Sequence, residues 1–178
     1  ADALDDALQC TAVGYNALST NASGNYNTAV GAGALFTTTG ANNTAVGQGC
    51  AYGLTSGSDN TAMGYAALDA TFTGSNATAI GSGAASAATS AGDVTAIGFS
   101  ALTANTTGSY NTALGRGALQ SATYSYNIGI GVQAGDNLST NGYGNIIIGH
   151  YVDTAASDSQ NTCKIVSWDG SSAVNHFI

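Results

Sequence analysis

Few residues of this chain could carry out acid–base, nucleophilic or metal chemistry. There are two histidines, His150 and His176, and neither lies near another strong metal ligand at a recognisable spacing. Gly-x-Gly strings such as Gly31-Ala32-Gly33 lack the following helix and acid of a dinucleotide site. Calcium-binding β-rolls place an aspartate in every repeat, whereas the aspartates here are scattered over unlike positions: Asp59, Asp69, Asp93, Asp136 and Asp153. We therefore expect no catalytic residue, no metal, no cofactor and no enzymatic activity.

The composition excludes several classes of partner. Only 7% of the 178 residues are charged, the net charge is −8, and Arg116 and Lys164 are the only fixed cations. Binding to nucleic acid requires lysine and arginine to neutralise phosphates, and an anionic membrane surface attracts the same residues. No apolar run approaches the roughly 20 residues of a membrane span. The composition thus argues against nucleic acid, a charged membrane surface and membrane insertion. The scarcity of cleavage sites for trypsin-like proteases suits a location outside the cell.

A repeated motif organises the chain. Thr28-Ala29-Val30-Gly31 returns with conservative changes, and the final glycine of each copy falls 16 to 18 residues after the previous one. These glycines are Gly14, Gly31, Gly47, Gly64, Gly81, Gly98, Gly115, Gly131 and Gly149. So steady a period over nine copies predicts an all-β, parallel β-solenoid (a β-roll or β-helix) of about nine coils with a repeat of about 17 residues.

Within each coil we predict a strand, a glycine corner, a second short arc and a polar turn. The second arc begins with a pair such as Ala34-Leu35, which fits either a strand or one helical turn. A position that is always filled by a large aliphatic residue predicts an inward ladder, with the threonine two residues earlier inward or at its boundary. This core ladder is Val13, Val30, Val46, Met63, Ile80, Ile97, Leu114, Ile130 and Ile148. The alanine between the two, as in Ala29, is then expected to face outward, where a neighbouring chain could approach closely.

Asparagines recur just before the strands and predict a second ladder. Its members are Asn27, Asn43, Asn60, Asn111, Asn127, Asn145 and Asn161. Stacked asparagine amides can hydrogen-bond from coil to coil. Ala77 and Val94 interrupt the row.

The two ends differ from the middle. Residues 1–9 have an amphipathic pattern that predicts a short helix or a cap, and residues 10–160 hold the repeats. Residues 161–178 give a degenerate last coil and two short runs around Asp169-Gly170, which predict a hairpin. An exposed solenoid end requires a cap. Trp168, Phe177 and Ile178 could supply a cap, or the tail could be donated as a strand to another molecule.

The cysteines add one hypothesis about assembly. Cys50 replaces an alanine of the repeat and is expected to be a small buried residue. Cys10 and Cys163 lie in the first and last coils, which stacking at about 4.8 Å a coil would place roughly 40 Å apart. A disulfide needs Cα atoms within about 7 Å. The two residues could therefore pair only between molecules stacked head to tail.

The repeat resembles known fibre proteins. The Asn-Thr-Ala-Val-Gly motif, followed by Ala-Leu and Thr-Thr-Gly-Ser, is similar to repeats of phage tail-fibre and bacterial surface proteins. The forms Ala79-Ile80-Gly81 and Ala96-Ile97-Gly98 resemble head repeats of trimeric autotransporter adhesins. The resemblance covers roughly residues 10–165. It implies a parallel β-roll, commonly trimeric, in a secreted fibre that touches a cell surface or matrix.

We therefore expect a non-enzymatic, extracellular or cell- or virion-surface fibre protein whose main partner is itself. Two versions remain open, a subunit that polymerises end to end and a trimeric adhesive shaft, with surface or matrix glycans as further partners. The alternative function is a glycan-binding or ice-binding solenoid. Ice binding would require the threonine row, which begins Thr11, Thr28 and Thr44, to face outward.

Overall fold

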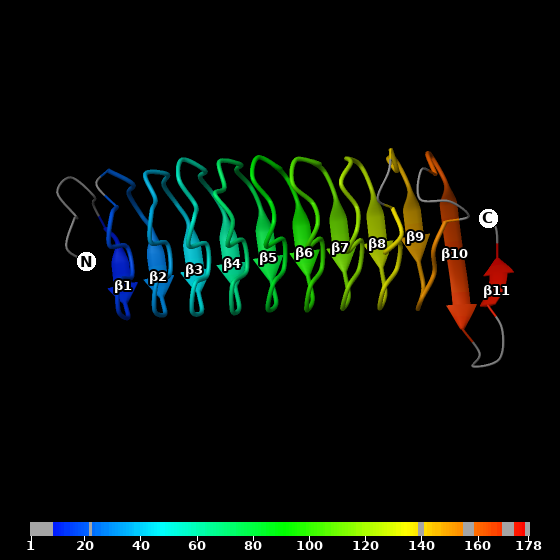
Figure 1. Ribbon diagram of the computed structural model, residues 1–178, viewed down its shortest axis with the longest axis horizontal. Helices are drawn as coiled ribbons and strands as arrows, with labels where there is room; N and C mark the ends of the chain where they lie inside the picture. The colour runs from blue at the N-terminus through cyan, green and yellow to red at the C-terminus, as the bar shows by residue number, and fades with distance from the viewer. Residues whose placement is uncertain (1–8, 22, 139–140, 155–158, 169–172, 177–178) are drawn as a thin grey trace.

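The structure, a computed structural model, describes residues 9–21, 23–138, 141–154, 159–168 and 173–176. Within these ranges the regular elements are all strands, which stack into one sheet in sequence order (Figure 1). The strands are β1 (Thr11–Val13), β2 (Thr28–Val30), β3 (Thr44–Val46), β4 (Thr61–Met63), β5 (Thr78–Ile80), β6 (Thr95–Ile97), β7 (Thr112–Leu114), β8 (Ile128–Ile130), β9 (Ile146–Ile148), β10 (Cys163–Trp168) and β11 (Ala173–His176). β1 to β10 are parallel to one another, and β11 is antiparallel to β10. The predicted parallel β-solenoid is confirmed.

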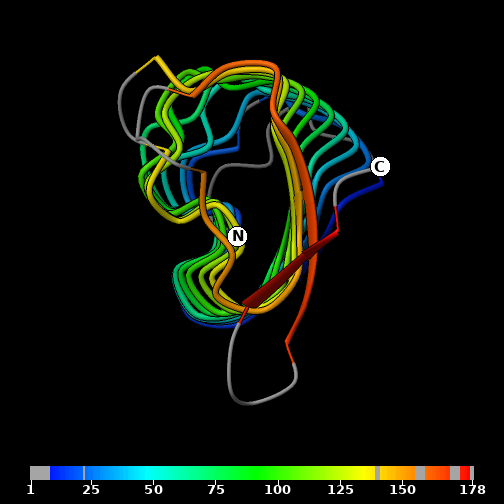
Figure 2. The same cartoon turned by 90° about the vertical axis from the view of Figure 1, so that its right-hand side faces the viewer.

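Equivalent residues of successive coils lie directly above one another. Thr28 pairs with Thr44, Ala29 with Ala45 and Val30 with Val46, and every later pair keeps this register. Viewed down the rod, the coils almost superimpose around a narrow interior (Figure 2). The ladder is therefore made of like residues stacked along the axis.

The glycine that ends each strand motif is required by contact as well as by conformation. Gly47 has φ of +138°, a region that side chains rarely adopt, and a Cβ there would lie 2.5 Å from the carbonyl oxygen of Gly64 in the next coil. The corner thus brings the backbones of adjacent coils too close together for any side chain.

The strands face the opposite way from the prediction. The middle residue of each strand from β2 to β9 is buried, and Ala29, Ala45, Ala79, Ala96 and Ala113 are all 0% exposed. The aliphatic residues assigned to an inward ladder lie on the outer surface. Val13 is 57% exposed and Met63 and Leu114 are each 45% exposed, while Val30, Val46, Ile80, Ile97, Ile130 and Ile148 are half-buried. The prediction of an aliphatic core ladder is wrong, and the alanine row is core and not a flank for another chain.

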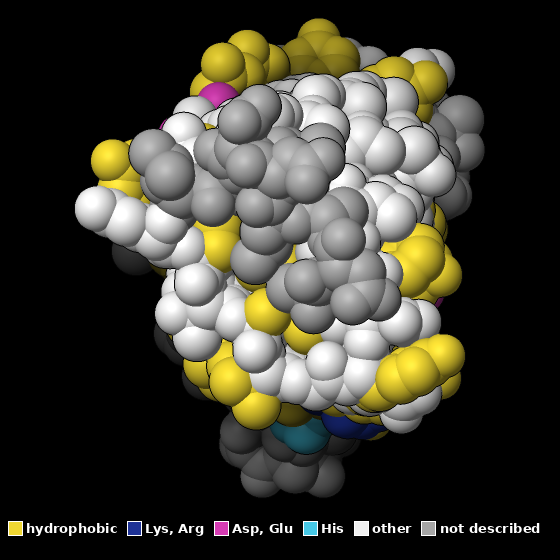
Figure 3. All heavy atoms as spheres, turned by 90° about the vertical axis from the view of Figure 1, so that its left-hand side faces the viewer, with side chains coloured by type: hydrophobic (Ala, Val, Ile, Leu, Met, Phe, Trp, Pro, Cys, Tyr) yellow, Lys and Arg dark blue, Asp and Glu magenta, His cyan; other side chains and the backbone are white. Residues whose placement is uncertain are grey.

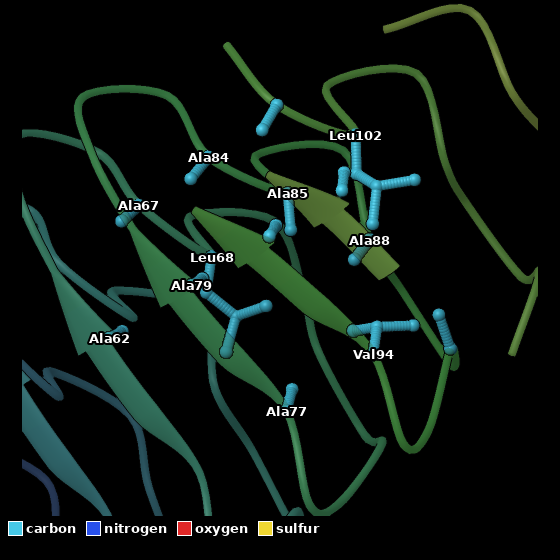
Figure 4. Packing of buried hydrophobic residues seen from close by; sticks show 14 of the residues in the cluster. Ala62, Ala67, Leu68, Ala77, Ala79, Ala84, Ala85, Ala88, Val94 and Leu102 are labelled. Atoms are coloured by element: carbon cyan, nitrogen blue, oxygen red, sulfur yellow. The ribbon is translucent and has the colours of Figure 1, made fainter. Parts of the chain in front are cut away.

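Leucines of the second arc fill the interior instead. Leu18, Leu35, Leu68, Leu102 and Leu119 are fully buried, each after a buried alanine. Figure 4 shows Leu68 and Leu102 within the interior, where alanines of the strands and of the arcs surround them. Because a leucine reaches across a narrow coil, the strand opposite it has room only for a small side chain.

The second arc is neither a strand nor a helical turn. Leu35 has φ of 48°, in the left-handed region, and its N–H donates to the carbonyl of Cys50 in the next coil at 3.1 Å. Left-handed backbone costs roughly 1–2 kcal/mol for a residue with a side chain. The buried side chain and the coil-to-coil hydrogen bond offset that cost.

The C-terminal end departs from the repeat. β10 continues past the ladder with β9, and Ile165 to Trp168 pair antiparallel with β11, as the two runs around Asp169-Gly170 predict. The N-terminal helix or cap was predicted for residues 1–9, and residues 1–8 lie outside the described residues, as do Phe177 and Ile178. Trp168 lies at the end of β10.

Candidate functional site

The outer face of the sheet is the first candidate surface. We define it as the first and third residues of β1 to β9, which alternation places on the side opposite the buried middle residue. Its first row is Thr11, Thr28, Thr44, Thr61, Thr78, Thr95, Thr112, Ile128 and Ile146, and its second row is the aliphatic series from Val13 to Ile148. All these side chains are half-buried or exposed, and none of them carries a charge. The threonine row therefore faces outward, the condition set for ice binding.

An asparagine ladder holds the coils together on the inner side. The Asn27 Oδ1 accepts from the N–H of Asn43 at 2.8 Å, and the Asn43 Oδ1 accepts from the N–H of Asn60 at 3.0 Å. The Nδ2 of Asn43 donates to the carbonyl of Gly57 at 2.9 Å. Asn111, Asn127 and Asn145 form a second run of the same bonds. These six asparagines are buried.

Asn161 does not belong to that ladder. The Oδ1 of Asn145 accepts from the N–H of Thr162 at 3.0 Å, so Thr162 occupies the equivalent position. Asn161 is exposed and has φ of 52°, like Tyr126 at the same place in an earlier coil. The sequence motif shifted by one residue here because the last coil is degenerate.

A second kind of buried asparagine was not predicted. The Nδ2 of Asn21 donates to the carbonyl of Gly24 at 2.8 Å, and its Oδ1 accepts from the Gly24 N–H at 2.8 Å. Asn105 and Gly108 repeat this pair. In the sequence, such a turn could be recognised by an asparagine three residues before a glycine. The two hydrogen bonds between these residues close the turn.

The N-terminal edge is the second candidate surface. The N–H of Thr11 donates to Asn27 and the carbonyl of Val13 accepts from Gly31, so in a parallel ladder the N–H and C=O of the intervening Ala12 point away from β2. Ala12 is exposed, although its equivalents in β2 and β3 are 0% exposed. In the space-filling view of this end, the described side chains are mostly apolar or uncharged, and charges lie at the margins (Figure 3).

The C-terminal edge is built differently. Lys164 pairs with Ile147 and so occupies the position that alanine holds in the interior coils. Its Nζ donates to the backbone carbonyl of Asp153 at 2.7 Å. The last parallel strand thus has a charged residue at the position that is apolar in the interior coils. The first strand, in contrast, belongs to the same Thr-Ala-Val-Gly motif as an interior coil.

The cysteines lie on different sides of the sheet. Cys163 is exposed and in register with Ile146 on the outer face. Cys10 packs against the buried cluster, and its Sγ lies 3.3 Å from the carbonyl of Gly24. Cys50 is buried as expected, and burial raises the pKa of its thiol to about 11.

The structure brings one pair of acids together that sequence reasoning missed. Asp136 and Asp153 lie in adjacent coils, and burial, followed by repulsion from Asp136, raises the pKa of Asp153 to about 6. The Oδ1 of Asp153 also accepts from the N–H of Asn137 at 3.2 Å. His150 is exposed and its ring stacks on Tyr151 at 4.4 Å, while the side chain of His176 lies outside the described part.

Within the described ranges, no three His, Cys or Asp side chains gather as metal ligands, and no cavity could enclose a small molecule. The same residues contain no helix long and apolar enough to span a membrane. Comparisons with protein-family models, with curated proteins and with solved structures find no match for this chain.

Proposed function

We propose that this protein is the non-enzymatic subunit of an extracellular fibre and that it associates with copies of itself end to end. The observation that carries the proposal is the N-terminal edge. There an interior-type strand, β1, presents its middle residue Ala12 to solvent.

Two properties make this edge an association surface. The outward N–H and C=O of Ala12 can accept an additional strand, and exposed strand edges pair readily with other chains. Ala12 itself, with Val13 beside it, is apolar surface that another coil would cover, as the coil of β1 covers Ala29. Each added coil thus contributes both backbone hydrogen bonds and apolar burial.

The partner for β1 lies at the opposite end of a second copy. β11 is the last strand of the sheet, and its edge away from β10 completes the stack. Joining unlike ends is a heterologous contact, and such contacts produce open filaments when the rotation does not close. The rod-like shape, with the two strand edges at its two ends, suits this arrangement (Figure 1).

The proposal relies on backbone pairing and not on a disulfide. In this arrangement β11 lies between β10, which carries Cys163, and β1 of the next copy, so the two cysteines are separated by two strand spacings, roughly 10 Å. A disulfide needs Cα atoms within about 7 Å.

The trimeric version lacks the contact expected for it, because the alanine row is buried. Of the two candidate surfaces described above, the outer face is the one that runs along the rod and could support a lateral contact. That face is three residues wide, about 10 Å, and roughly 40 Å long, or about 400 Å². A standard interface buries about 800 Å² on each partner, so the outer face alone is too small for a stable lateral contact.

Sedimentation and negative-stain microscopy of wild-type protein and of Ala12→Lys test the proposal. The lysine adds a charge to the edge without altering the bonds between β1 and β2, so wild-type fibres should become short monomeric rods. Thr107→Lys adds the same charge on an exposed turn of an interior coil and should leave the fibres intact. Wild-type protein that stays monomeric at high concentration, or fibres that tolerate Ala12→Lys, would overturn end-to-end association.

A further inference from the structure

The outer face is more regular than a fibre subunit requires. Threonine occupies its first row in seven successive coils, and the pairing keeps each threonine over the next: Thr11, Thr28, Thr44, Thr61, Thr78, Thr95 and Thr112. Branched side chains suit a pleated strand, but valine or isoleucine would serve as well as threonine at these outward positions. The repeated hydroxyl therefore calls for a role at the surface.

The face forms a two-row grid, with one fixed period along the rod and one fixed separation between the rows. Hydroxyls repeat about 4.8 Å apart along the rod, and each lies two residues, or about 6.6 Å, from an aliphatic side chain of the same strand. Threonine, valine and isoleucine are stiff at χ1. The ladder also presses each side chain against its neighbours, since Thr28, Thr44, Thr78 and Thr95 are only half-exposed. The grid is thus held in place before anything binds.

The chemistry of the grid fits ordered water. Each hydroxyl can donate one and accept two hydrogen bonds. The methyl groups of threonine and the neighbouring aliphatic row form no hydrogen bonds, so water molecules above them must bond to other water molecules. No charged side chain lies in either row to impose a different hydration shell. The period of about 4.8 Å along the rod is close to a repeat of oxygen atoms on a prism face of ice.

We propose that the outer face is an ice-binding surface, on which the threonine hydroxyls anchor a water layer that matches the ice lattice. The occupant is the ice crystal and not a protein, because a strip of about 400 Å² is half of what a stable protein interface uses. The site is separate from the N-terminal edge, so ice binding and fibre assembly can fail independently.

Thermal hysteresis and the shape of single ice crystals test this directly. Wild-type protein should lower the growth temperature of ice below its melting temperature and should facet the crystal. Thr61→Tyr places a bulky ring in the middle of the grid, at a position that is already exposed, and should abolish most of the hysteresis. Thr107→Tyr makes the same exchange at an exposed turn off the face and should retain it.

Further measurements separate the outcomes. Ala12→Lys, monomeric under the proposed function, should still show hysteresis, because its outer face is unchanged. The proposal is overturned if wild-type protein shows no hysteresis, or if Thr61→Tyr and Thr107→Tyr behave alike while circular dichroism shows both to be folded. It is also overturned if Thr61→Tyr changes the sedimentation coefficient and not the hysteresis, because the face would then be a contact between copies.

Discussion

Replacing Asn43 by alanine should destabilise the protein by about 4 kcal/mol. The side chain of Asn43 is buried and makes three hydrogen bonds: Nδ2 donates to the Gly57 carbonyl, and Oδ1 accepts from the N–H and the Nδ2 of Asn60. In the variant, the Nδ2 of Asn60 keeps its hydrogen bond to the Gly74 carbonyl at 3.2 Å. Two main-chain groups lose their partner on Asn43: the N–H of Asn60 and the carbonyl of Gly57. Each orphaned buried group costs roughly 1–3 kcal/mol, which gives about 4 kcal/mol for the two.

The chain supplies a matched control at the same place in another coil. Val94 occupies the asparagine position with an apolar side chain that is 1% exposed. Val94→Ala removes two methyl groups and no hydrogen bond, which should cost about 2 kcal/mol.

Urea denaturation of both variants measures the difference, and hydrogen exchange at the amide of Asn60 tests its cause. We expect Asn43→Ala to be the less stable variant by about 2 kcal/mol and the Asn60 amide to lose protection only there. Equal stability of the two variants, or an unchanged Asn60 amide, would show that the ladder adds nothing beyond filling space.

Two further predictions concern the corner and the acid pair. Gly47→Ala should lower the free energy of unfolding by more than about 3 kcal/mol, because its Cβ would clash with the Gly64 carbonyl. Gly49 has φ of +61° and the nearest neighbour of its Cβ would be 4.0 Å away, so Gly49→Ala should lower it by only about 1 kcal/mol. Thermal melting of the two variants compares these losses. Burial raises the pKa of Asp153 to about 6 in the folded protein, so the folded state binds the proton more tightly and stability should rise as pH falls from about 6 towards 4. Because Asp153 is partly exposed, the gain in stability is limited to about 1 kcal/mol. Asp153→Asn should remove this pH-dependent gain. If the stability of the wild-type protein stays constant or falls over this pH range, the pKa shift is contradicted.

Features that follow from backbone geometry alone were predictable from the sequence. The glycine period gave the solenoid, because a corner as tight as that at Gly47 excludes every side chain wherever it recurs. The asparagine row was also predictable, since a buried amide such as that of Asn127 must find partners, which it does at Tyr124 just before it and in the following coil. Both arguments depend on identical residues at a fixed interval and not on knowing which side of the strand is buried.

The direction of the strand faces could not be obtained from hydrophobicity. Valine and isoleucine are favoured in strands whether or not they are buried, because their branched side chains suit a pleated surface. An alternating Thr-Ala-Val therefore offers two solutions, and side-chain size argues for the wrong one. What decides between them is the width of the coil, which is set by the leucine of the second arc and by the buried asparagines.

Two exceptions within the chain carried the missing information. β8 has Gly129 at the inner position, where a Cβ would lie 2.6 Å from the Cγ of Leu119. In the second arc of the same coil Gly135 stands where the leucine would be, and β9 then supplies Ile147, which is 0% exposed. A small residue opposite a leucine and a large residue opposite a glycine conserve the interior volume, as close packing demands. This compensation identifies the middle residue of each strand as the inner one, and it leaves the threonines and aliphatics free to be selected for what lies outside the rod.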